Sequence, residues 1–249
     1  MRNLKISVVT VSYNCADVIE DTIQSVTSQT YTNIEYIIVD GKSKDNTLSV
    51  INKYKDQINI IVSEPDKGIY DAMNKAINLA TGDYVIFMNA GDVFYNNKIV
   101  EKVFYDNKIV DADIIYGSVA FDKKGKEIEV KPLNFDEFWK GSRFCHQSAF
   151  ISLSLHKEFV YDLKYKIAAD FNFFNKMYHT GKNFVFIDFP FSKISLGGVS
   201  DVARIQLIQE YLDIINKKSF SVYCYYGVSA LKAAILSRGK ILTYFLFNK

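Results

Sequence analysis

Residues 84–92, which read YVIFMNAGD, are typical of a buried strand that ends in polar residues. Mostly apolar, β-prone side chains run directly into Asn89, Gly91 and Asp92. A carboxylate that is buried without a partner is costly, so Asp92 is expected either to reach water or to hold a ligand. The alternative is a tight turn after the strand, in which Gly91 supplies the backbone freedom.

Similar strands precede this one, and helical patterns separate them. Strands are predicted at 6–14, 34–41, 58–68 and 83–92, and helices at 16–30, 43–57 and 69–82. Such alternation is typical of βαβ units. The fold class that we expect is therefore α/β, with a Rossmann-like, mostly parallel sheet flanked by helices.

The second half has a less regular, mixed pattern. Strands are predicted at 112–122, 145–152 and 183–195, helices at 99–104, 135–141, 168–181 and 201–218, and a hairpin turn at 123–127. No repeat or low-complexity linker separates the halves. We expect one compact unit with halves at 1–120 and 121–218 and a helical tail at 219–249.

Composition excludes several classes of protein. The chain has 249 residues, of which 49% are hydrophobic, and a net charge of +2, which gives no electrostatic case for nucleic acid. Cys15, Cys145 and Cys224 are odd in number and far apart, which favours a reducing compartment. The first apolar stretch reads as a strand and not as a signal peptide. We therefore expect a cytoplasmic protein.

The tail is unusually aromatic and basic. No apolar run in it is long enough to span a membrane, because Lys232, Arg238 and Lys240 interrupt it. One interpretation is a helix that packs on the domain or on a partner subunit. The other is a helix that lies in a membrane interface.

Polar residues follow every strand of the first half. The strand ends read SYN at 12–14, DG at 40–41, EPDKG at 64–68 and NAGD at 89–92. In open parallel sheets, ligands bind at the carboxyl ends of the strands, where these acids would converge. Convergent carboxylates repel one another unless a cation or a donor lies among them. Each of these strand-end motifs, taken alone, is explained equally well as a turn or a helix cap.

Two nucleotide-binding motifs are absent. The GKS at 41–43 lacks the earlier glycine of a P-loop, since Tyr36 stands there, and the first strand lacks G-x-G-x-x-G. Cys145 and His146 would point to opposite faces of a strand, so they do not form a dyad.

The motifs together resemble a known family. SVVTVSYN, IIVDGKSKDNT, SEPDKGIYDAMNKAINLATGDYVIFMNAGD, CHQSAFI and IAADFNFFNKM occur in the order typical of family 2 glycosyltransferases of the A-type fold. The resemblance covers roughly residues 4–200, and the variants NAGD and GGVS are similar to a branch that builds bacterial polysaccharide repeat units. It implies inverting transfer of a hexosyl group from a nucleotide sugar, most simply a UDP-sugar, to a glycan or lipid-linked acceptor at the inner face of the membrane.

The resemblance also implies site residues. Asp170 matches the general base, His146 a position on the acceptor side, and Asp92 a ligand of Mg²⁺ or Mn²⁺. Donor-binding positions are matched by Thr10, Ser12, Tyr13, Asn14, Asp40, Glu64, Asp66, Gly68, Asn74, Asn89 and Gly91. Residues 197–200 match a loop that closes over the donor. Residues 89–92 correspond to the D-x-D region, whose acids hold the metal in this family. Asn89 and Gly91 replace these acids, so weak metal binding is expected.

Two alternatives stay open at this point. A non-catalytic nucleotide-sugar-binding subunit of a polysaccharide assembly complex would explain the reduced metal motif. A nucleotidyltransferase also uses acidic strand ends, but its basic, glycine-rich first loop is not matched by SYNCAD at 12–17. The tail is expected to contact either the membrane or a second subunit.

Overall fold

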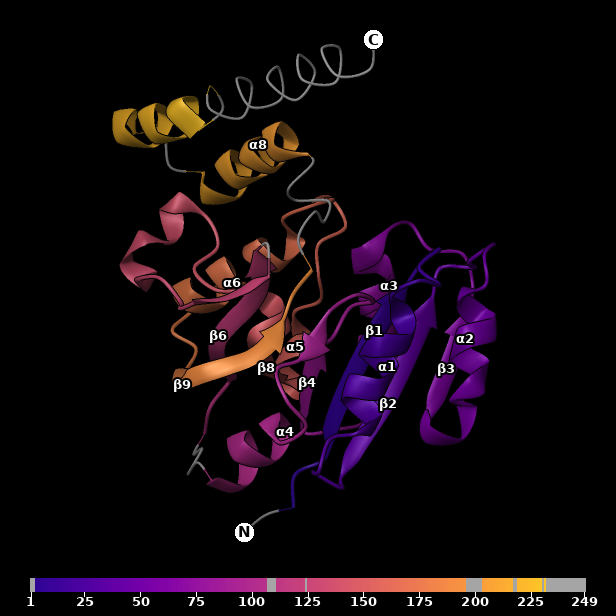
Figure 1. Ribbon diagram of the computed structural model, residues 1–249. Coiled ribbons are helices and arrows are strands. Elements are labelled where there is room, and N and C mark those ends of the chain that lie inside the picture. The colour runs from indigo at the N-terminus through magenta and orange to yellow at the C-terminus, as the bar shows by residue number, and fades with distance from the viewer. Residues whose placement is uncertain are drawn as a thin grey trace.

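The computed structural model describes residues 3–106, 111–123, 125–195, 203–216, 219–229 and 231. Within these ranges, nine strands form one sheet in the order β3-β2-β1-β4-β8-β6-β9-β5, with β7 paired to β6. The strands are β1 (Ile6–Ser12), β2 (Ile34–Asp40), β3 (Ile60–Ser63), β4 (Tyr84–Phe87), β5 (Val93–Phe94), β6 (Ile114–Lys123), β7 (Lys126–Val130), β8 (Ala149–Ser152) and β9 (Phe184–Lys193). Figure 1 shows the first three strands side by side in indigo and purple.

Helices cover both faces of this sheet. They are α1 (Ile19–Thr27), α2 (Thr47–Lys53), α3 (Ile69–Leu79), α4 (Ile99–Glu101), which continues into a π-helical turn at Lys102–Asp106, α5 (Leu153–Glu158), α6 (Ala169–His179) and α8 (Arg204–Ile215). In Figure 1, α8 lies above α6, in the half of the molecule that is coloured magenta to orange. The expected mixed α/β architecture with a mostly parallel sheet is confirmed.

The parallel half follows the predicted order. β1 pairs in parallel with β2 and β4, and β2 with β3. Alternate residues of each strand enter different cores: Val9 and Phe87 pack with α3 and α6, whereas Val8 and Ile86 pack with α1 and α2. Because both faces are covered, these strands are almost continuously apolar, as the sequence indicates.

The second half mixes strand directions. β8 pairs antiparallel with β4 and β6, while β6 pairs in parallel with β9 and forms the predicted hairpin with β7. The boundary expected near residue 120 falls within β6, and the division at that residue stays a prediction.

One predicted strand is wrong in its first half. The strand expected at 145–152 begins only at Ala149, because His146–Ser148 form a short 3-10 helix. The amide of Ser148 donates to the carbonyl of Cys145 and closes this turn. His146 is therefore presented by a turn, where it does not have to alternate with its neighbours across a sheet.

At the amino ends of the strands, Glu35 forms a saturated polar cluster. Its carboxylate accepts hydrogen bonds from Lys5, Ser7 and Thr81, at 2.5 to 2.8 Å. Burial alone would raise the pKa of Glu35, but these hydrogen bonds outweigh it and lower the pKa to about 2. The cluster ties β1, β2 and the loop after α3 together.

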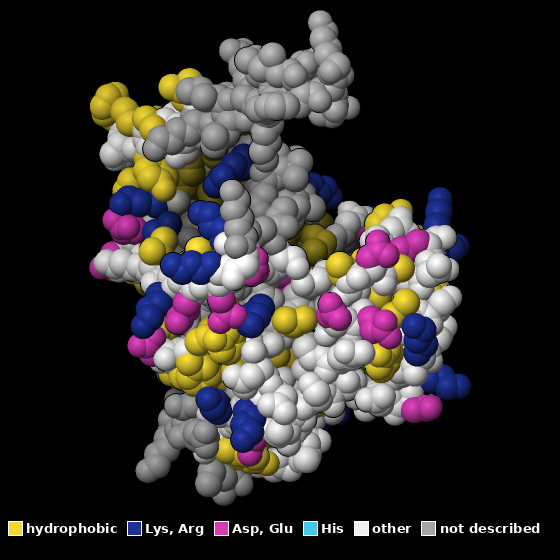
Figure 2. All heavy atoms as spheres, in the orientation of Figure 1, with side chains coloured by type: hydrophobic (Ala, Val, Ile, Leu, Met, Phe, Trp, Pro, Cys, Tyr) yellow, Lys and Arg dark blue, Asp and Glu magenta, His cyan; other side chains and the backbone are white. Residues whose placement is uncertain are grey.

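The described part of the tail is a helical segment at 220–229. Val222 and Tyr226 are buried, and the hydroxyl of Tyr226 donates to the carbonyl of Trp139. Several large apolar side chains face outward: Phe220, Tyr223, Val228 and Leu231 are all more than half exposed. Figure 2 shows hydrophobic side chains at this end of the molecule, and basic and acidic side chains interspersed over the lower part. In the described ranges, no helix has the length and apolar character needed to cross a bilayer.

Candidate active site

The loops after β1 and β2 are tied to each other. The amide of Asn14 donates to Ser43, and the amide of Lys44 donates to the side chain of Asn14, both at 2.8 Å. Asp45 accepts from the amide of Ala16. Asn14 has a φ of 46°, a left-handed conformation that asparagine tolerates. These contacts bring the ends of neighbouring strands together, as the parallel order requires.

Asp40 is the most buried acid at this edge of the sheet. It has no exposed surface and accepts four hydrogen bonds, from the hydroxyls of Ser12, Ser43 and Ser63 and from the amide of Ser43. These donors occupy both carboxylate oxygens. Asp40 therefore orders the loops around it, and its predicted contact with the nucleoside would have to replace one of these donors.

Tyr13, Gly41 and Asp66 come together from three different loops. A Cβ atom on Gly41 would lie 2.4 Å from a carboxylate oxygen of Asp66 and 3.2 Å from the ring of Tyr13, so a larger residue at position 41 would displace the Asp66 side chain. The ring of Tyr13 is 60% exposed. Gly68 has a φ of 119° and opens α3, and its amide donates to Asp66. Glu64 lies in the same loop and pairs with Lys75.

Two predicted donor-side residues hold backbone groups of the protein. The amide group of Asn74 accepts from the amide of Tyr161 and donates to its carbonyl, which ties α3 to the second half. Thr10 is fully buried and donates to the carbonyl of Met88. The roles predicted for both toward the donor stay predictions.

The turn at 89–92 presents Asp92 at the end of β4. Gly91 has a φ of 98°, a conformation open mainly to glycine, and its amide donates to Thr22. Asp92 is 7% exposed. Its carboxylate accepts from the side chain of Gln147 at 2.9 Å and from the amide of Ser195 at 3.1 Å. Asp92 is thus largely buried, and each of its carboxylate oxygens has a hydrogen-bond donor.

The chemistry of Asp92 fits one ligand of a hard cation. Burial raises the pKa of Asp92, because the hydrogen bonds from Ser195 and Gln147 compensate only in part for lost hydration. A cation would stabilise the charged form. In the described ranges, no cluster of three or more metal-binding side chains exists, so phosphate oxygens of a ligand and water molecules would have to complete the coordination shell.

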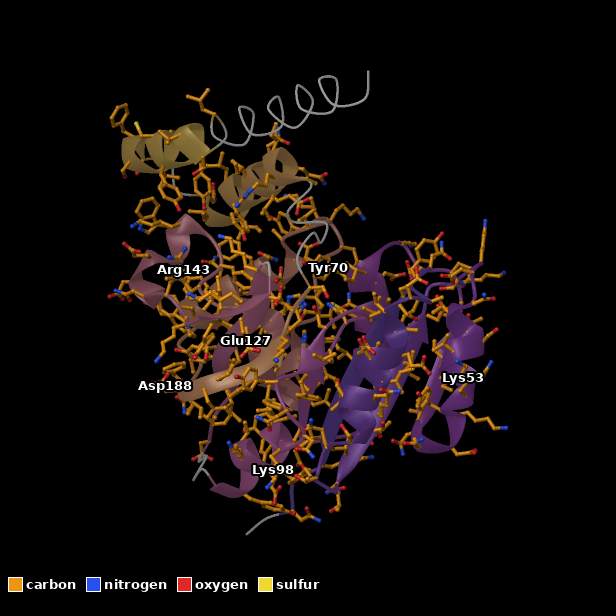
Figure 3. The ribbon with its side chains drawn as sticks, in the orientation of Figure 1. Lys53, Tyr70, Lys98, Glu127, Arg143 and Asp188 are labelled. Atoms are coloured by element: carbon orange, nitrogen blue, oxygen red, sulfur yellow. The ribbon has the colours of Figure 1, made fainter. Side chains whose placement is uncertain are left out.

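Asp170 lies in the first turn of α6, as predicted, and is held from two sides. Its Oδ2 lies 3.0 Å from Nδ1 of His146, and its Oδ1 lies 2.8 Å from the hydroxyl of Tyr70. The Nε2 atom of His146 in turn lies 3.2 Å from Nδ2 of Asn89. Figure 3 labels Tyr70, which comes from α3 and lies where the two halves of the molecule meet. His146 thus connects the end of β4 with the start of α6.

The surroundings of Asp170 favour its charged form. Burial alone would raise its pKa, but the hydrogen bond and charge of His146, the hydroxyl of Tyr70 and the amide of Phe171 outweigh burial, and the pKa is lowered. The carboxylate is 18% exposed, so it can contact a ligand. The sequence did not single out Tyr70, whose place among apolar helix residues is typical of a core tyrosine.

The segment before α6 is anchored by α8. The carboxylate of Glu210 accepts from the amides of Lys166, Ile167 and Ala168, at 2.9 to 3.1 Å. This anchor fixes the backbone that leads into Asp170. No sequence pattern linked Glu210 to the site.

Other side chains of the second half that were candidates for the site belong to the core. Phe138 is 2% exposed and packs on Phe171 and Tyr178, so core packing accounts for it. Burial raises the pKa of the Cys145 thiol to about 12, which makes it a poor nucleophile. The loop predicted at 197–200 lies outside the described residues.

Known structures share this architecture. The structure matches Staphylococcus aureus TarS 1–349 in complex with UDP with a TM-score of 0.67 and 18% identity, over 85% of this chain and 64% of that one. It matches the mannosyltransferase PcManGT from Pyrobaculum calidifontis, in complex with GDP-Man and Mn²⁺, with a TM-score of 0.70 and 15% identity, over 100% of this chain and 77% of that one. At these identities the likeness shows the fold alone, which is the A-type glycosyltransferase fold.

Sequence relatives define the family more closely. The family model described as "Glycosyl transferase family 2" matches residues 7–194, so the chain belongs to that family and is a glycosyltransferase. A PGL/p-HBAD biosynthesis glycosyltransferase of Mycobacterium bovis is 30% identical over 67% of each chain. The UDP-Glc:alpha-D-GlcNAc-diphosphoundecaprenol beta-1,3-glucosyltransferase WfaP of Escherichia coli is 40% identical over 39% of each chain.

Proposed function

We propose that this glycosyltransferase moves a hexosyl group from a UDP-sugar to a hydroxyl of a lipid-linked glycan, with inversion, in the synthesis of a surface polysaccharide. The observation that carries the proposal is the hydrogen-bonded path from Asn89 through His146 to Asp170. It joins the strand end expected to face the donor to the residue expected to act on the acceptor. The UDP-sugar and the lipid-linked acceptor are suggested by the name of the relative WfaP.

Asp170 is the base in this proposal. The acceptor hydroxyl attacks the anomeric carbon from the face opposite the nucleoside diphosphate, and its proton passes to a carboxylate oxygen of Asp170. The C–O bond to the diphosphate breaks as the new glycosidic bond forms. Because its lowered pKa keeps Asp170 ionised at neutral pH, the base is ready to accept the proton.

Asp92 would hold a divalent cation, Mg²⁺ or Mn²⁺, together with the donor diphosphate. When bound, such an ion supplies Lewis-acid stabilisation of the negative charge that grows on the leaving group. Support comes from the fit of a single carboxylate at the end of β4 and from Mn²⁺ in the complex of PcManGT. Since Asn89 and Gly91 are not acids, we expect the affinity for the free ion to be low.

The test is a transfer assay on the purified full chain. UDP- and GDP-sugars are offered with Mn²⁺ or Mg²⁺ and a synthetic lipid-diphosphate-linked monosaccharide, and the anomeric configuration of the product is read by NMR. One sugar nucleotide should give a product of inverted configuration. Retained configuration would refute inversion, and absence of both transfer and donor hydrolysis across the panel would refute the proposed reaction.

The alternative function, a non-catalytic sugar-nucleotide-binding subunit, rests on the reduced metal motif. It predicts stabilisation of the chain by UDP in a thermal-shift assay, no turnover, and no additional effect of Mn²⁺. A catalytic chain should show turnover that EDTA abolishes and Mn²⁺ restores. The two outcomes separate the hypotheses without a mutant.

We also propose that the tail helix contacts the inner face of the membrane, where a lipid-linked acceptor would be found. Phe220, Tyr223, Val228 and Leu231 present an apolar surface next to a basic terminal sequence, a pattern suited to the interface. Binding to anionic vesicles should fall when Phe220 and Tyr223 are changed to Ser. If the double variant instead turns a dimer into a monomer with no change in vesicle binding, the surface is a subunit contact.

A further inference from the structure

The side chain of Asn89 does not turn toward Asp92. Its Nδ2 lies 3.2 Å from Nε2 of His146, while the carboxylate of Asp92 is held by Gln147 and Ser195. The two adjacent residues His146 and Gln147 of one short 3-10 helix therefore contact Asn89 and Asp92 separately. The two polar ends of the NAGD turn thus contact different partners.

The surroundings of Asn89 leave it one side-chain partner among the described residues. Asn89 is 8% exposed, and its Oδ1 is buried with no hydrogen-bond partner in the described ranges. A buried amide oxygen without a hydrogen-bond partner is costly. The hydrogen bond from Nδ2 to His146 is therefore the interaction that holds the side chain of Asn89 in place.

We propose that Asn89 serves the base and not the donor: it orients the imidazole of His146, so that Nδ1–H points at Asp170. This inference rests on the proposed role of Asp170. A neutral imidazole has one donor and one acceptor nitrogen. When Asn89 donates to Nε2, the proton of the ring is carried by Nδ1, which lies 3.0 Å from Oδ2 of Asp170. His146 and Asn89 are positioning residues in this arrangement.

The residue type at position 89 is then explained. An aspartate has no hydrogen to donate when ionised, so it would require the proton of His146 on Nε2. Asparagine can donate to Nε2 and keep the proton on the side of Asp170. Asparagine in place of an acid of the D-x-D region therefore allows the base to be oriented through His146.

A spectroscopic experiment tests the orientation directly. The full chain has three histidines, so ¹⁵N-histidine labelling gives a sparse spectrum, which His156→Gln and His179→Gln variants assign. In the spectrum of the neutral ring, the proton of His146 should lie on Nδ1. In Asn89→Ala, the resonance of Nε2 should shift because it loses its donor. A proton on Nε2 in the wild type, or an unchanged resonance in the variant, would overturn the proposal.

Kinetics of two isosteric variants test the consequence. The side-chain amide of asparagine at position 146 overlies Nδ1, whereas that of glutamine overlies Nε2. We expect His146→Ala to lower kcat about 10- to 100-fold, since a hydrogen bond to a charged base is lost. His146→Asn should recover part of this loss and His146→Gln should not. Asn89→Ala should lower kcat about 3- to 10-fold with KM for the sugar nucleotide unchanged.

The outcomes separate this inference from the proposed function. If the wild-type chain transfers no sugar, the proposed function fails, and the NMR result still decides the orientation of His146. If the wild type transfers sugar but Asn89→Ala raises KM for the donor with kcat unchanged, Asn89 belongs to the donor site and the inference fails. Thermal unfolding of each variant shows that the fold is intact.

Discussion

The hydroxyl of Tyr70 lies 2.8 Å from Oδ1 of Asp170 and 2.8 Å from the carbonyl oxygen of Ile167, although it carries one proton. When Asp170 is ionised, Tyr70 can donate to it. When Asp170 is protonated on Oδ1, the carboxyl group can donate to Tyr70, whose own proton then turns to Ile167. The structure therefore offers hydrogen bonds to both protonation states of Asp170, as a residue that gains a proton during a reaction requires.

Asp170→Asn should abolish transfer and spare donor binding. An amide cannot accept the proton of the acceptor hydroxyl, so kcat should fall by about 10²- to 10⁴-fold, the usual contribution of a general base. Affinity for UDP, measured by calorimetry, should stay within about twofold, since Asp170 is not expected to contact the nucleotide. The matched control is Asp188→Asn, an exposed acid labelled in Figure 3 far from Tyr70, which should have wild-type kcat. Loss of UDP affinity in Asp170→Asn would contradict the role of base.

Tyr70→Phe should shift the pH dependence of the reaction. The hydroxyl of Tyr70 is one of the groups that lower the pKa of Asp170, so its removal should raise that pKa. Activity is lost as pH falls and the base is protonated, so the acid limb of kcat/KM should move to higher pH. Tyr95→Phe, which removes an exposed hydroxyl bonded to Glu127, is the control and should leave the limb in place. An unmoved limb in Tyr70→Phe would argue against Asp170 as the titrating base.

Glu210→Ala should lower both stability and kcat. It removes the acceptor of the amides of residues 166–168, at a cost of about 1–3 kcal/mol in the free energy of unfolding. The loosened start of α6 should lower kcat more than it raises KM for the donor. Glu210→Gln keeps one carbonyl acceptor and should restore part of both losses. Urea unfolding and steady-state kinetics measure the two effects, and equal stability of the Ala and Gln variants would contradict the anchoring role.

His156 should make the fold sensitive to mild acid. It has no exposed surface, and burial lowers its pKa from 6.5 to about 4. Between these values the unfolded chain binds a proton that the folded chain does not, so stability falls as pH falls from 6.5 to 4. The loss from this residue reaches about 3 kcal/mol at the lower end. At pH 7.5, which is above both pKa values, His156 is neutral in the folded and the unfolded chain and causes no loss of stability.

The measurement is urea unfolding at several pH values between 7.5 and 4.5. His156→Gln, which does not titrate, should have lower stability at pH 7.5 but a shallower dependence on pH than the wild type. His179→Gln removes an exposed histidine and should leave the slope unchanged. Parallel slopes for the wild type and His156→Gln would show that His156 has the same pKa in the folded and the unfolded chain, which would contradict the prediction.

The parallel half could be predicted from sequence because its signals are local. β1, β2 and β4 are apolar runs bounded by turn residues, and α3 follows from its periodic apolar face. The boundaries differ more: the strand expected at 58–68 spans Ile60–Ser63, because the chain turns into its polar loop after Ser63. The fold class needed only the order of these elements.

The site was predicted in part, for reasons of distance along the chain. Asp170 and His146 are site candidates because their motifs resemble a family, and their roles stay predictions. Their partners Tyr70 and Asn89 could not be linked to them, since the contacts join residues 57 to 100 positions apart. The turn at His146 is predicted as a strand because CHQSAFIS contains no glycine or proline that would indicate a turn. Gln147 and Ser195 reach Asp92 only through tertiary structure.

The saturated cluster around Glu35 bears on how this chain could be engineered. Lys5, Ser7, Glu35 and Thr81 fasten the first two strands and the loop after α3 at the rim opposite the reaction. This cluster holds the first two strands together at the end of the sheet away from the loops that would recognise sugars. Those loops can be exchanged with those of other transferases to seek new specificities. A graft that removes the hydrogen bonds to Glu35 would instead destabilise the sheet.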